Sequence, residues 1–561
     1  MIQPELTRIL TDAARAAAPE LGLEPDAVPQ PELDRPRVKE HGDWATNLAL
    51  VLAAKAGRKP REVAEAIVAR IEPGAYVTRV EIAGPGFINL FLGLGWLHDA
   101  LREILRAGEQ FGRADAPTGR RVQVEFVSAN PTGPLHIGHA RNAVLGDAIA
   151  NLLEAAGDRV EREYYYNDAG RQMELFGRSV EARLLQLHGR DAHLPEDGYA
   201  GEYIKDVAKE VDRRIDPSVL DLPQDERWRA VLNEAVQVML REIEATLERF
   251  GIRFDTYARQ REFHESGAIH EAVEKLRAAG YVYDRDGAVW FRSTAFGDDK
   301  DRVVIRSNGE PTYFGADCAY IINKFERGFD HLVYVWGADH HGDVVRVKGA
   351  AQALGYDPDA VEIVLYQFVS FLRGGKPVQM SKRSGDLLTL DELLDEVGRD
   401  AARYTLLMRS SDSAIEFDIE EVTRQSLDNP VYYVQYAHAR IASLVRRAVG
   451  QGVELHPWDG ATFERLEHPS ELELIGKLSE FPDVVDTAAT SKAPHRLTRY
   501  VEEAAAAFHR FYTDCRVITE DAELTRTRLW LSVAAKQVIG SALGLLGVSA
   551  PESMERLPDD E

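Results

Sequence analysis

The chain has 561 residues, of which 45% are hydrophobic and 28% are charged, and its formal net charge is −25. A chain of this length can bury more than one core, so we expect roughly two to four domains. It has no apolar stretch of transmembrane length and no basic-then-apolar leader, and its two cysteines, Cys318 and Cys515, are too few for a disulfide framework or a thiolate zinc site. These features predict a cytoplasmic, multidomain protein that has no membrane partner, no structural zinc and no organic cofactor.

Residues 1–110 predict a small α+β module. An amphipathic helix comes first, followed by a proline-rich connector at 25–36. Helices are expected at 46–55 and 60–70, and strands at 77–82 and 87–92. Gly84-Pro85-Gly86 predicts the turn that joins the two strands.

Residues 115–395 alternate apolar strands with helical periods, which predicts a Rossmann-like, doubly wound parallel sheet. The first strand is expected at 122–127 and the second at 159–166. A long helical insertion is expected at about 171–250. Short apolar runs at 303–305, 331–336 and 361–365 suit later buried strands of the same sheet.

The turn after the first strand is the strongest candidate for phosphate chemistry. An extended lead-in at 128–135 ends in His136-Ile137-Gly138-His139, and a helical pattern begins at Ala140. Gly138 has no Cβ to keep a nucleotide at a distance, and the helix N-terminus directs N–H groups and a positive dipole end at the turn. Two histidines three residues apart also suit a metal pair or a satisfied core pair, so the turn alone leaves these readings open.

Residues 396–561 contain no convincing strand and predict an all-α bundle. Helical periods are expected at 400–408, 430–447, 472–481, 495–513 and 524–546. The acidic net charge argues at first sight against a nucleic-acid partner, since Lys and Arg neutralise phosphate. Basic residues nevertheless cluster at 58–61, 120–121, 382–383 and 446–447. Such clusters can form local positive faces on an acidic protein, although the simpler interpretation of any single cluster is ordinary solvated surface charge.

A second loop, 374–385, has the sequence GGKPVQMSKRSG. Together with the histidine turn and the segment 337–341, it resembles the class I aminoacyl-tRNA synthetase family, in which the turn is the HIGH motif and the loop is the KMSKS motif. Gln379 stands where that motif has its first lysine. The HIGH region then comprises Ala129, Asn130, Pro131, Thr132, Gly133, Pro134, Leu135, His136, Ile137, Gly138 and His139.

Other segments are similar to the arginyl branch of that family. Segments 40–47 and 83–89 resemble its N-terminal extension, which contacts the corner of the tRNA, and segments 400–404 and 428–440 resemble its DALR anticodon-binding domain. The resemblance therefore divides the chain into 1–110, 115–395 and 396–561. It implies tRNA contacts at Asn47, Tyr432, Tyr436 and Arg440. The last three share one helical face, although tyrosines there also suit helix packing.

The resemblance implies an arginine–tRNA ligase. Such an enzyme activates L-arginine with ATP and Mg²⁺ to arginyl-adenylate, releases pyrophosphate, and transfers arginine to the 3′-terminal adenosine of tRNA-Arg; we expect a monomer. The implied catalytic residues are His136, His139, Lys382 and Arg383. The implied ATP contacts are Pro134, Gly138, His139, Asp339, His340, Met380, Ser381 and Lys382. The implied arginine contacts are Glu125, Asn130, His136, Tyr313 and Asp317.

Gln379 affects how the second loop can act. A neutral amide cannot supply the field of a lysine, so either Lys376 substitutes for it or the loop closes only once tRNA is bound. Arginyl enzymes as a group resemble the second case, because they need tRNA even to form the adenylate. We therefore expect the same requirement for this chain.

Three other functions remain as alternatives. A nucleotidylyltransferase without a tRNA step can also carry an H-x-G-H turn, but it needs neither the bundle nor the N-terminal module. A metal-dependent hydrolase could use His136, His139, His340 and His341, but it requires carboxylate or cysteine ligands as well. A non-enzymatic tRNA-binding protein leaves the phosphate loops unexplained. Sister synthetases of the cysteinyl and methionyl types would be expected to carry cysteine clusters for zinc.

Overall fold

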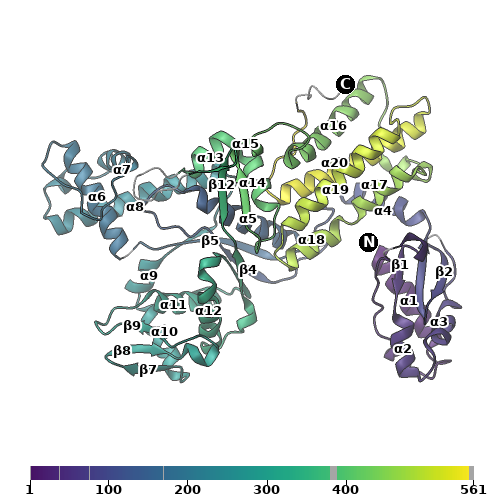
Figure 1. Ribbon diagram of the computed structural model, residues 1–561, viewed down its shortest axis with the longest axis horizontal. Helices are drawn as coiled ribbons and strands as arrows, with labels where there is room; N and C mark the ends of the chain where they lie inside the picture. Colours follow the sequence, from purple (N-terminus) through teal and green to yellow (C-terminus); the bar gives the residue numbers. More distant parts are fainter. Residues whose placement is uncertain (1, 37, 75, 169, 379–387, 555–561) are drawn as a thin grey trace.

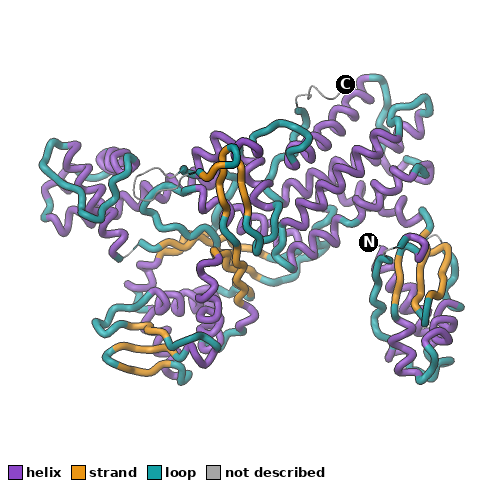
Figure 2. Tube along the Cα trace, in the orientation of Figure 1, coloured by secondary structure: helices purple, strands orange, loops and turns teal. Residues whose placement is uncertain are grey.

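The structure, a computed structural model, describes residues 2–36, 38–74, 76–168, 170–378 and 388–554. A parallel sheet lies at the centre, with a helical insertion on one side and a long helical bundle on the other (Figure 1). A small antiparallel sheet lies below the central one, and the N-terminal module stands apart beyond the bundle (Figures 1 and 2). The predicted fold class is confirmed: α+β module, parallel α/β domain with a helical insertion, and all-α bundle.

The N-terminal module packs three helices on a three-stranded antiparallel sheet of order β1-β3-β2. Its elements are α1 (Ile2–Ala17), β1 (Trp44–Thr46), α2 (Leu48–Ala56), α3 (Pro60–Val68), β2 (Val77–Ala83) and β3 (Phe87–Leu92). The module has its own apolar core, which includes Leu6, Leu10, Ile88 and Leu90. The sequence predicted both longer strands, but it missed β1, which has only three residues.

The central sheet has the order β11-β10-β4-β5-β6, and all four pairings are parallel. Its strands are β4 (Arg121–Glu125), β5 (Arg159–Tyr166), β6 (Thr256–Arg259), β10 (His331–Gly337) and β11 (Val361–Tyr366). The chain leaves β4 towards β5 on one side and returns to β10 on the other, so the strand order reverses between β4 and β10. Ligands of open α/β sheets bind at such a reversal, beyond the carboxyl ends of the strands. The histidine turn leaves β4 at this point.

Side chains of β10 alternate between two apolar cores. Val333 and Val335 face a core shared with α5 (Ala140–Ala155), whereas Leu332 and Tyr334 face a second core that includes side chains of α11 (Tyr313–Glu326). The first core continues into the insertion and the bundle. The insertion was predicted as helical and consists of α6 (Arg171–Leu187), α7 (Tyr203–Asp212) and α8 (Gln224–Arg249). The second core also takes in α9 (Gln260–Glu265), α10 (Ala268–Ala278) and α12 (His341–Ala353).

The prediction that 303–305 joins the central sheet is wrong. These residues belong to β9 (Arg302–Ile305), which pairs antiparallel with β8 (Ala288–Phe291), and β8 pairs antiparallel with β7 (Val282–Arg285). The missed signal is Asp286-Gly287, whose φ angles of 53° and 74° suit the tight turn of a β-hairpin. With that hairpin in place, the next short strand pairs locally rather than with the distant parallel sheet.

The expectation of no strand after residue 396 is also wrong. β14 (Ile415–Asp418) pairs in parallel with β12 (Val369–Arg373), which pairs antiparallel with β13 (Lys376–Pro377). Four residues whose partner is distant in the sequence carry no local signal. Three helices lie beside this sheet: α13 (Leu390–Val397), α14 (Arg399–Leu407) and α15 (Ile419–Val422).

The bundle consists of α16 (Pro430–Gly450), α17 (Pro469–Ser479), α18 (Phe481–Thr490), α19 (His495–Asp514) and α20 (Ala522–Leu545). α4 (Gly95–Ala107) packs against α17 and α20. This helix lies within the first sequence block but shares its core with the bundle. The N-terminal module is thus joined to the body by a helix that the bundle holds in place. Within the described residues, every helix is too short or too polar to cross a membrane.

Candidate active site

The backbone between β4 and the histidine turn is strained. Val127 and Ser128 have φ angles of 65° and 46°, a left-handed conformation that β-branched residues rarely adopt. Asn142, on the first turn of α5, holds this kink by accepting the Val127 N–H at 2.5 Å and donating to the Val335 carbonyl at 2.8 Å. One amide therefore ties the ends of β4 and β10 together beneath the turn. Sequence reasoning missed Asn142.

The two histidines of the turn hold each other in place. The Nδ1 atom of His136 accepts the Gly138 N–H at 3.1 Å, and the Nδ1 atom of His139 accepts the His136 N–H at 3.2 Å. Their ring centres are 3.9 Å apart. An Nδ1 that accepts requires the proton of a neutral ring to be on Nε2, so both rings carry their N–H donor at the outer nitrogen. A Cβ on Gly138 would lie 2.8 Å from the His136 ring, which explains the glycine.

The segment that follows the second loop returns directly to the histidine turn. The Ile137 N–H donates to the Leu388 carbonyl at 3.1 Å, and the Leu390 N–H donates to the Leu135 carbonyl at 2.8 Å. The near end of the loop is held at the β12–β13 hairpin, where Val378 N–H donates to Phe371 O at 2.9 Å. The predicted loop residues themselves lie outside the described part of the chain: Gln379, Met380, Ser381, Lys382 and Arg383.

The first turn of α11 presents the predicted guanidinium contacts. The side chain of Thr312 caps the helix by accepting the Gly315 N–H at 3.2 Å. Tyr313 is 62% exposed, and Asp317 lies one turn later on the same face. Among the described residues Asp317 makes no ion pair. Burial, with the nearby Glu125 carboxylate, raises the pKa of Asp317 to about 7.

Glu125, at the end of β4, already has a cationic partner. The Lys324 ammonium lies 2.5 Å from its Oε2, and its Oε1 accepts the Ser128 hydroxyl at 3.2 Å. The structure thus pairs Glu125 with Lys324, a residue that sequence reasoning missed. The signal was available, because Lys324 follows Asp317 by seven residues and so lies on the same helical face.

Asn130 lies in the lead-in to the histidine turn. Its amide donates to Gln172 Oε1 at 3.1 Å and accepts the Asn167 N–H at 3.3 Å. Asp339 and His340 follow the end of β10. His340 Nδ1 lies 3.1 Å from an Asp343 oxygen, and both of the predicted residues are more than half exposed. These positions border the carboxyl edge of the sheet.

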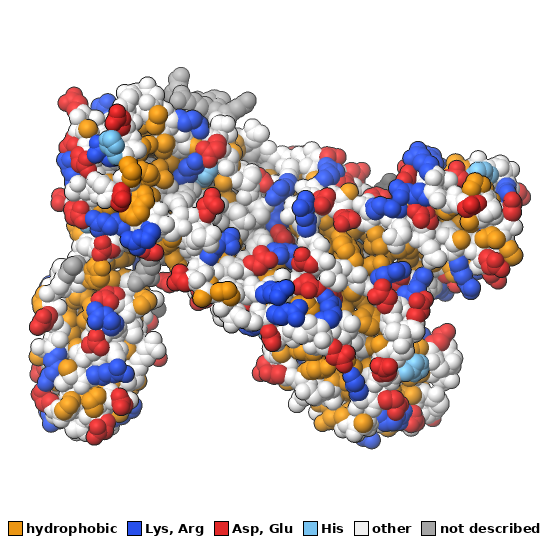
Figure 3. Space-filling model, turned by 180° about the vertical axis from the view of Figure 1, so that it is seen from behind, with side chains coloured by type: hydrophobic (Ala, Val, Ile, Leu, Met, Phe, Trp, Pro, Cys, Tyr) orange, Lys and Arg blue, Asp and Glu red, His pale blue; other side chains and the backbone are white. Residues whose placement is uncertain are grey.

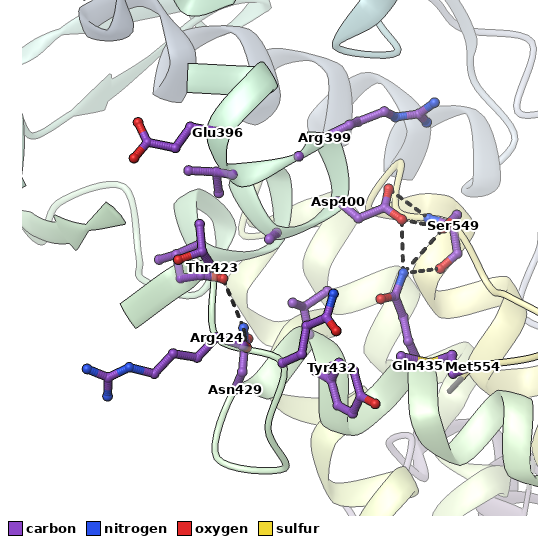
Figure 4. A pocket seen from close by; sticks show the side chains of 16 residues that line it. Glu396, Arg399, Asp400, Thr423, Arg424, Asn429, Tyr432, Gln435, Ser549 and Met554 are labelled. Atoms are coloured by element: carbon purple, nitrogen blue, oxygen red, sulfur yellow. Dashed lines mark hydrogen bonds between the residues drawn. The ribbon is translucent and has the colours of Figure 1, made fainter. Parts of the chain in front are cut away.

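A large cavity of about 860 Å³ lies where α14, the segment before α16 and the last described residues meet (Figure 4). Gln435 Nε2 donates to Asp400 Oδ2 and to the Ser549 carbonyl, each at 2.9 Å, so Asp400 of the DALR-like segment connects three parts of the chain. Tyr432 lines this cavity, but only 9% of its surface is exposed. The structure therefore packs Tyr432 at the edge of the cavity rather than presenting a free ring face.

A second cavity, of about 310 Å³, lies further along α16 and is strongly basic. Arg440 lies 4.5 Å from the Tyr512 ring centre and 5.5 Å from that of Tyr436. Arg446 and Arg447 line the same cavity. Burial alone would raise the pKa of Tyr512. The hydrogen bond from Arg447 and the charges of Arg447 and Arg440 outweigh burial, so the pKa of Tyr512 is lowered overall. Sequence reasoning did not identify Tyr512, which lies on a helix distant in the sequence.

In the N-terminal module, Asn47 precedes α2, and its carbonyl accepts the N–H groups of Leu50 and Val51. It is half-buried. On the face drawn in Figure 3, acidic and basic side chains are interspersed over all lobes. Local basic sites such as the second cavity therefore exist on a chain whose net charge is −25.

Comparisons with known proteins cover nearly the whole chain. A family model described as the class I tRNA synthetase (R) catalytic domain matches residues 100–443. Models described as the arginyl tRNA synthetase N terminal domain and the DALR anticodon binding domain match residues 4–92 and 434–554.

Two curated relatives are named arginine–tRNA ligase. The one from Moorella thermoacetica is 50% identical over 550 residues, which is 98% of each chain. The one from Carboxydothermus hydrogenoformans is 49% identical over 523 residues, which is 93% of this chain and 94% of the relative. A solved structure of the Thermus thermophilus arginyl-tRNA synthetase is 24% identical and has the same fold, with a TM-score of 0.73 over 98% of this chain and all of that one.

Proposed function

The chain belongs to the arginyl-tRNA synthetase family, and we propose how its own residues carry out the two steps of tRNA aminoacylation with arginine. In the first step an arginine carboxylate oxygen attacks the α-phosphorus of ATP, and pyrophosphate leaves. In the second step a ribose hydroxyl at the tRNA 3′ end, the 2′ one by family resemblance, attacks the arginyl carbonyl, and AMP leaves. Neither step needs an enzyme nucleophile, so catalysis depends on positioning and on charge stabilisation.

The histidine turn binds the α-phosphate. His136 and His139 each direct an Nε2–H away from the backbone groups that occupy Nδ1. Two fixed donors can stabilise the charge that develops on the phosphoryl oxygens without reorganising. The N-terminus of α5 adds a positive dipole end. Pro134 and Gly138 shape the turn on which the nucleotide lies, and Asp339 and His340 take its ribose and adenine side.

The arginine lies between α11 and the lead-in to the turn. Asp317 accepts the guanidinium, and Tyr313 contributes its hydroxyl one turn earlier. Asn130 holds the α-amino end, and His136 lies near the carboxylate by family resemblance. Glu125, which is paired with Lys324, adds a second carboxylate nearby, and a planar cation that meets carboxylates in such a site forms strong charge-assisted pairs. The absence of any ion pair at Asp317 among the described residues is the observation that best supports this assignment.

The second loop closes over the β and γ phosphates. Met380, Ser381, Lys382 and Arg383 are assigned to this role by family resemblance. Supporting evidence comes from Leu388, whose pairing with Ile137 brings one end of the loop to the histidine turn. Mg²⁺ enters bound to the ATP phosphates, as part of the substrate.

The tRNA binds along the bundle and the N-terminal module. Arg440, Tyr436 and Tyr512 supply a cation beside two aromatic rings, a combination that suits an unstacked anticodon base and its phosphate. Tyr432 supports the neighbouring cavity, and Asn47 lies in the module that meets the corner of the tRNA. We also propose that the protein acts as a monomer in the cytoplasm, where its proposed substrates are found.

Arginine-dependent exchange of pyrophosphate into ATP tests this function. The purified protein should catalyse exchange with L-arginine in the presence of tRNA-Arg, and lysine or citrulline should replace arginine poorly. Exchange that depends on another amino acid would indicate a synthetase specific for that amino acid instead of arginine. Adenylyl transfer to an acceptor phosphate without any amino acid would favour a nucleotidylyltransferase instead.

A further inference from the structure

The lead-in to the histidine turn is held on both sides of Asn130. The Tyr164 hydroxyl donates to the Ala129 carbonyl at 2.8 Å and accepts the Ala129 N–H at 3.2 Å. Beyond Asn130, the Tyr203 hydroxyl of α7 donates to the Thr132 carbonyl at 2.8 Å. The Thr132 N–H donates to the Asn130 carbonyl at 2.8 Å and closes a tight turn. The backbone of Asn130 is therefore fixed, and its exposed side chain is the part that can still turn.

The amide of Asn130 is held between two neighbouring segments. Its Oδ1 atom accepts the backbone N–H of Asn167, directly after β5, at 3.3 Å. Its Nδ2 atom donates to Oε1 of Gln172, on the first turn of α6, at 3.1 Å. A backbone N–H can only donate, so Oδ1 of Asn130 must face Asn167 and the amino group must face Gln172. The two contacts together select one of the two amide orientations.

The start of α6 also borders the proposed arginine site. A Cβ on Gly170, directly before the helix, would lie 3.9 Å from the Tyr313 hydroxyl. Gln172 follows two residues later, and its side chain is exposed, as are those of Asn130 and Tyr313. The start of α6 thus lies beside both Asn130 and Tyr313, which the proposed function assigns to opposite ends of the amino acid.

We propose that Gln172 is a positioning residue that selects for the α-ammonium group of arginine. An ammonium can only donate hydrogen bonds, so it needs Oδ1 of Asn130, which has a second lone pair after it accepts the Asn167 N–H. An amide turned the other way would present N–H groups to the cation and repel it. Gln172 stabilises the productive orientation by accepting from Nδ2. This inference rests on the proposed role of Asn130 and adds a residue that acts through Asn130 rather than by touching arginine.

The test compares two ligands that differ only at this group: L-arginine and 5-guanidinopentanoate, which lacks the α-amino group. Calorimetry measures the affinity of each for the full-length wild type and for Q172M, a variant that removes the acceptor without adding a charge. Q172M should bind L-arginine about three- to tenfold more weakly, the value of one neutral hydrogen bond. Its affinity for 5-guanidinopentanoate should not change, because that ligand makes no use of the Asn130 acceptor.

Three further variants separate orientation from packing and from direct contact. Q172E keeps an acceptor at the same place, so it should keep at least the wild-type preference for L-arginine. Gln186→Met, on the same helix, also loses one hydrogen bond, from its Nε2 to the Ala192 carbonyl at 2.7 Å, and should bind both ligands as the wild type does. N130A removes the group through which Gln172 acts, so adding Q172M to N130A should cause no further loss of L-arginine affinity.

Equal weakening of both ligands by Q172M would overturn the role of Gln172, because a distorted site would then explain the effect. A wild-type preference for L-arginine in Q172M would overturn it as well. A further loss on adding Q172M to N130A would also overturn it, since Gln172 would then contact arginine itself.

Two other outcomes bear on the proposed function. Failure of the wild type to bind L-arginine would contradict the proposed function itself. An N130A variant that keeps the full preference for L-arginine over 5-guanidinopentanoate would overturn both the assignment of Asn130 and the role of Gln172.

Discussion

The side chain of Asn142 holds the backbone N–H of Val127 at 2.5 Å, and Val127 is the left-handed residue at which the chain leaves the central strand. The same amide donates to Val335 on the neighbouring strand. A strained residue persists only when its surroundings hold it in place. The kink that directs the lead-in towards the histidines therefore depends on a helix residue three positions after the second histidine.

Replacing Asn142 by alanine should lower the turnover of pyrophosphate exchange by at least about tenfold and destabilise the fold by roughly 1–3 kcal/mol, because a buried N–H and a buried carbonyl lose their partner. Asn151→Ala is a matched control on the same helix. It also loses two hydrogen bonds, with Leu545 and Arg162, but lies away from the turn. Thermal unfolding and steady-state kinetics measure the two effects. If both variants lose turnover in proportion to stability, Asn142 has no specific positioning role.

Substitutions at His139 should lower turnover far more than arginine affinity, because the imidazole acts on the transition state. Asparagine can replace Nδ1 as the acceptor for the His136 N–H, whereas glutamine can place a donor near the Nε2 position. We expect His139→Gln to retain more activity than His139→Asn, and His139→Ala to lose about 10²–10³ in turnover. An alanine variant with unchanged turnover would remove His139 from the mechanism.

The sequence was most informative where local pattern and final contacts agree. Residues 159–166 were expected as a strand and form β5 with the same limits; this short segment lies between two helical periods and ends in three tyrosines, a residue type that favours strands. The histidine turn was predicted from its own residues, whereas Asp317 was assigned to the arginine site by family resemblance, and both roles stay predictions. In each case the residues that led to the prediction are close together in the sequence.

The sequence was least informative where two distant segments define the feature. Strand β14 pairs with β12 over about fifty residues, and Glu125 and Lys324 meet from different elements. The spacing of Lys324 from Asp317 indicates a shared helical face but not its pairing with Glu125, and Tyr512 carries no local signal of Arg440. The apolar residues at 303–305 suited two sheets equally well, and the Asp286-Gly287 hairpin decided between them.

Arginine affinity of the wild type should fall as the pH decreases below 7. The pKa of Asp317 is raised to about 7, chiefly by burial, and arginine binds its ionised form. At pH 6 about a tenth of Asp317 is ionised, so arginine should bind roughly tenfold more weakly than at pH 8. The opposite sign applies to stability: the folded state binds this proton more tightly than the unfolded state, so the contribution of Asp317 to stability decreases as the pH rises from about 4 to 7.

Asp317→Asn should abolish this pH dependence and weaken arginine binding by about 10- to 150-fold, the value of a charged hydrogen bond. Asp359→Asn, an exposed acid on the same domain, is the control and should behave as wild type. Calorimetric titration with L-arginine at several pH values measures both effects. A pH profile that survives in Asp317→Asn would assign the titration to another group.

Adenylate formation should require tRNA. Gln379 leaves the second loop with one fewer cation than the family motif, so the loop needs another contribution before it closes over the phosphates. Exchange of pyrophosphate into ATP should therefore be negligible with arginine alone and should appear when tRNA-Arg is added. Gln379→Lys should restore part of the exchange without tRNA. Efficient exchange by the wild type without tRNA would refute the requirement and would direct attention to Lys376.

Arg440→Met should raise the KM for tRNA with little change in turnover at saturating tRNA. The Arg440 guanidinium lies between the rings of Tyr436 and Tyr512, in a cavity that Arg446 and Arg447 also line. Removing one cation from a phosphate-binding surface should reduce the salt dependence of tRNA binding by about one unit of slope. Arg499→Met is the matched control, because Arg499 is an exposed bundle arginine paired with Glu503. Aminoacylation at two salt concentrations separates the variants, and equal salt slopes for the wild type and Arg440→Met would place the anticodon contact elsewhere on the bundle.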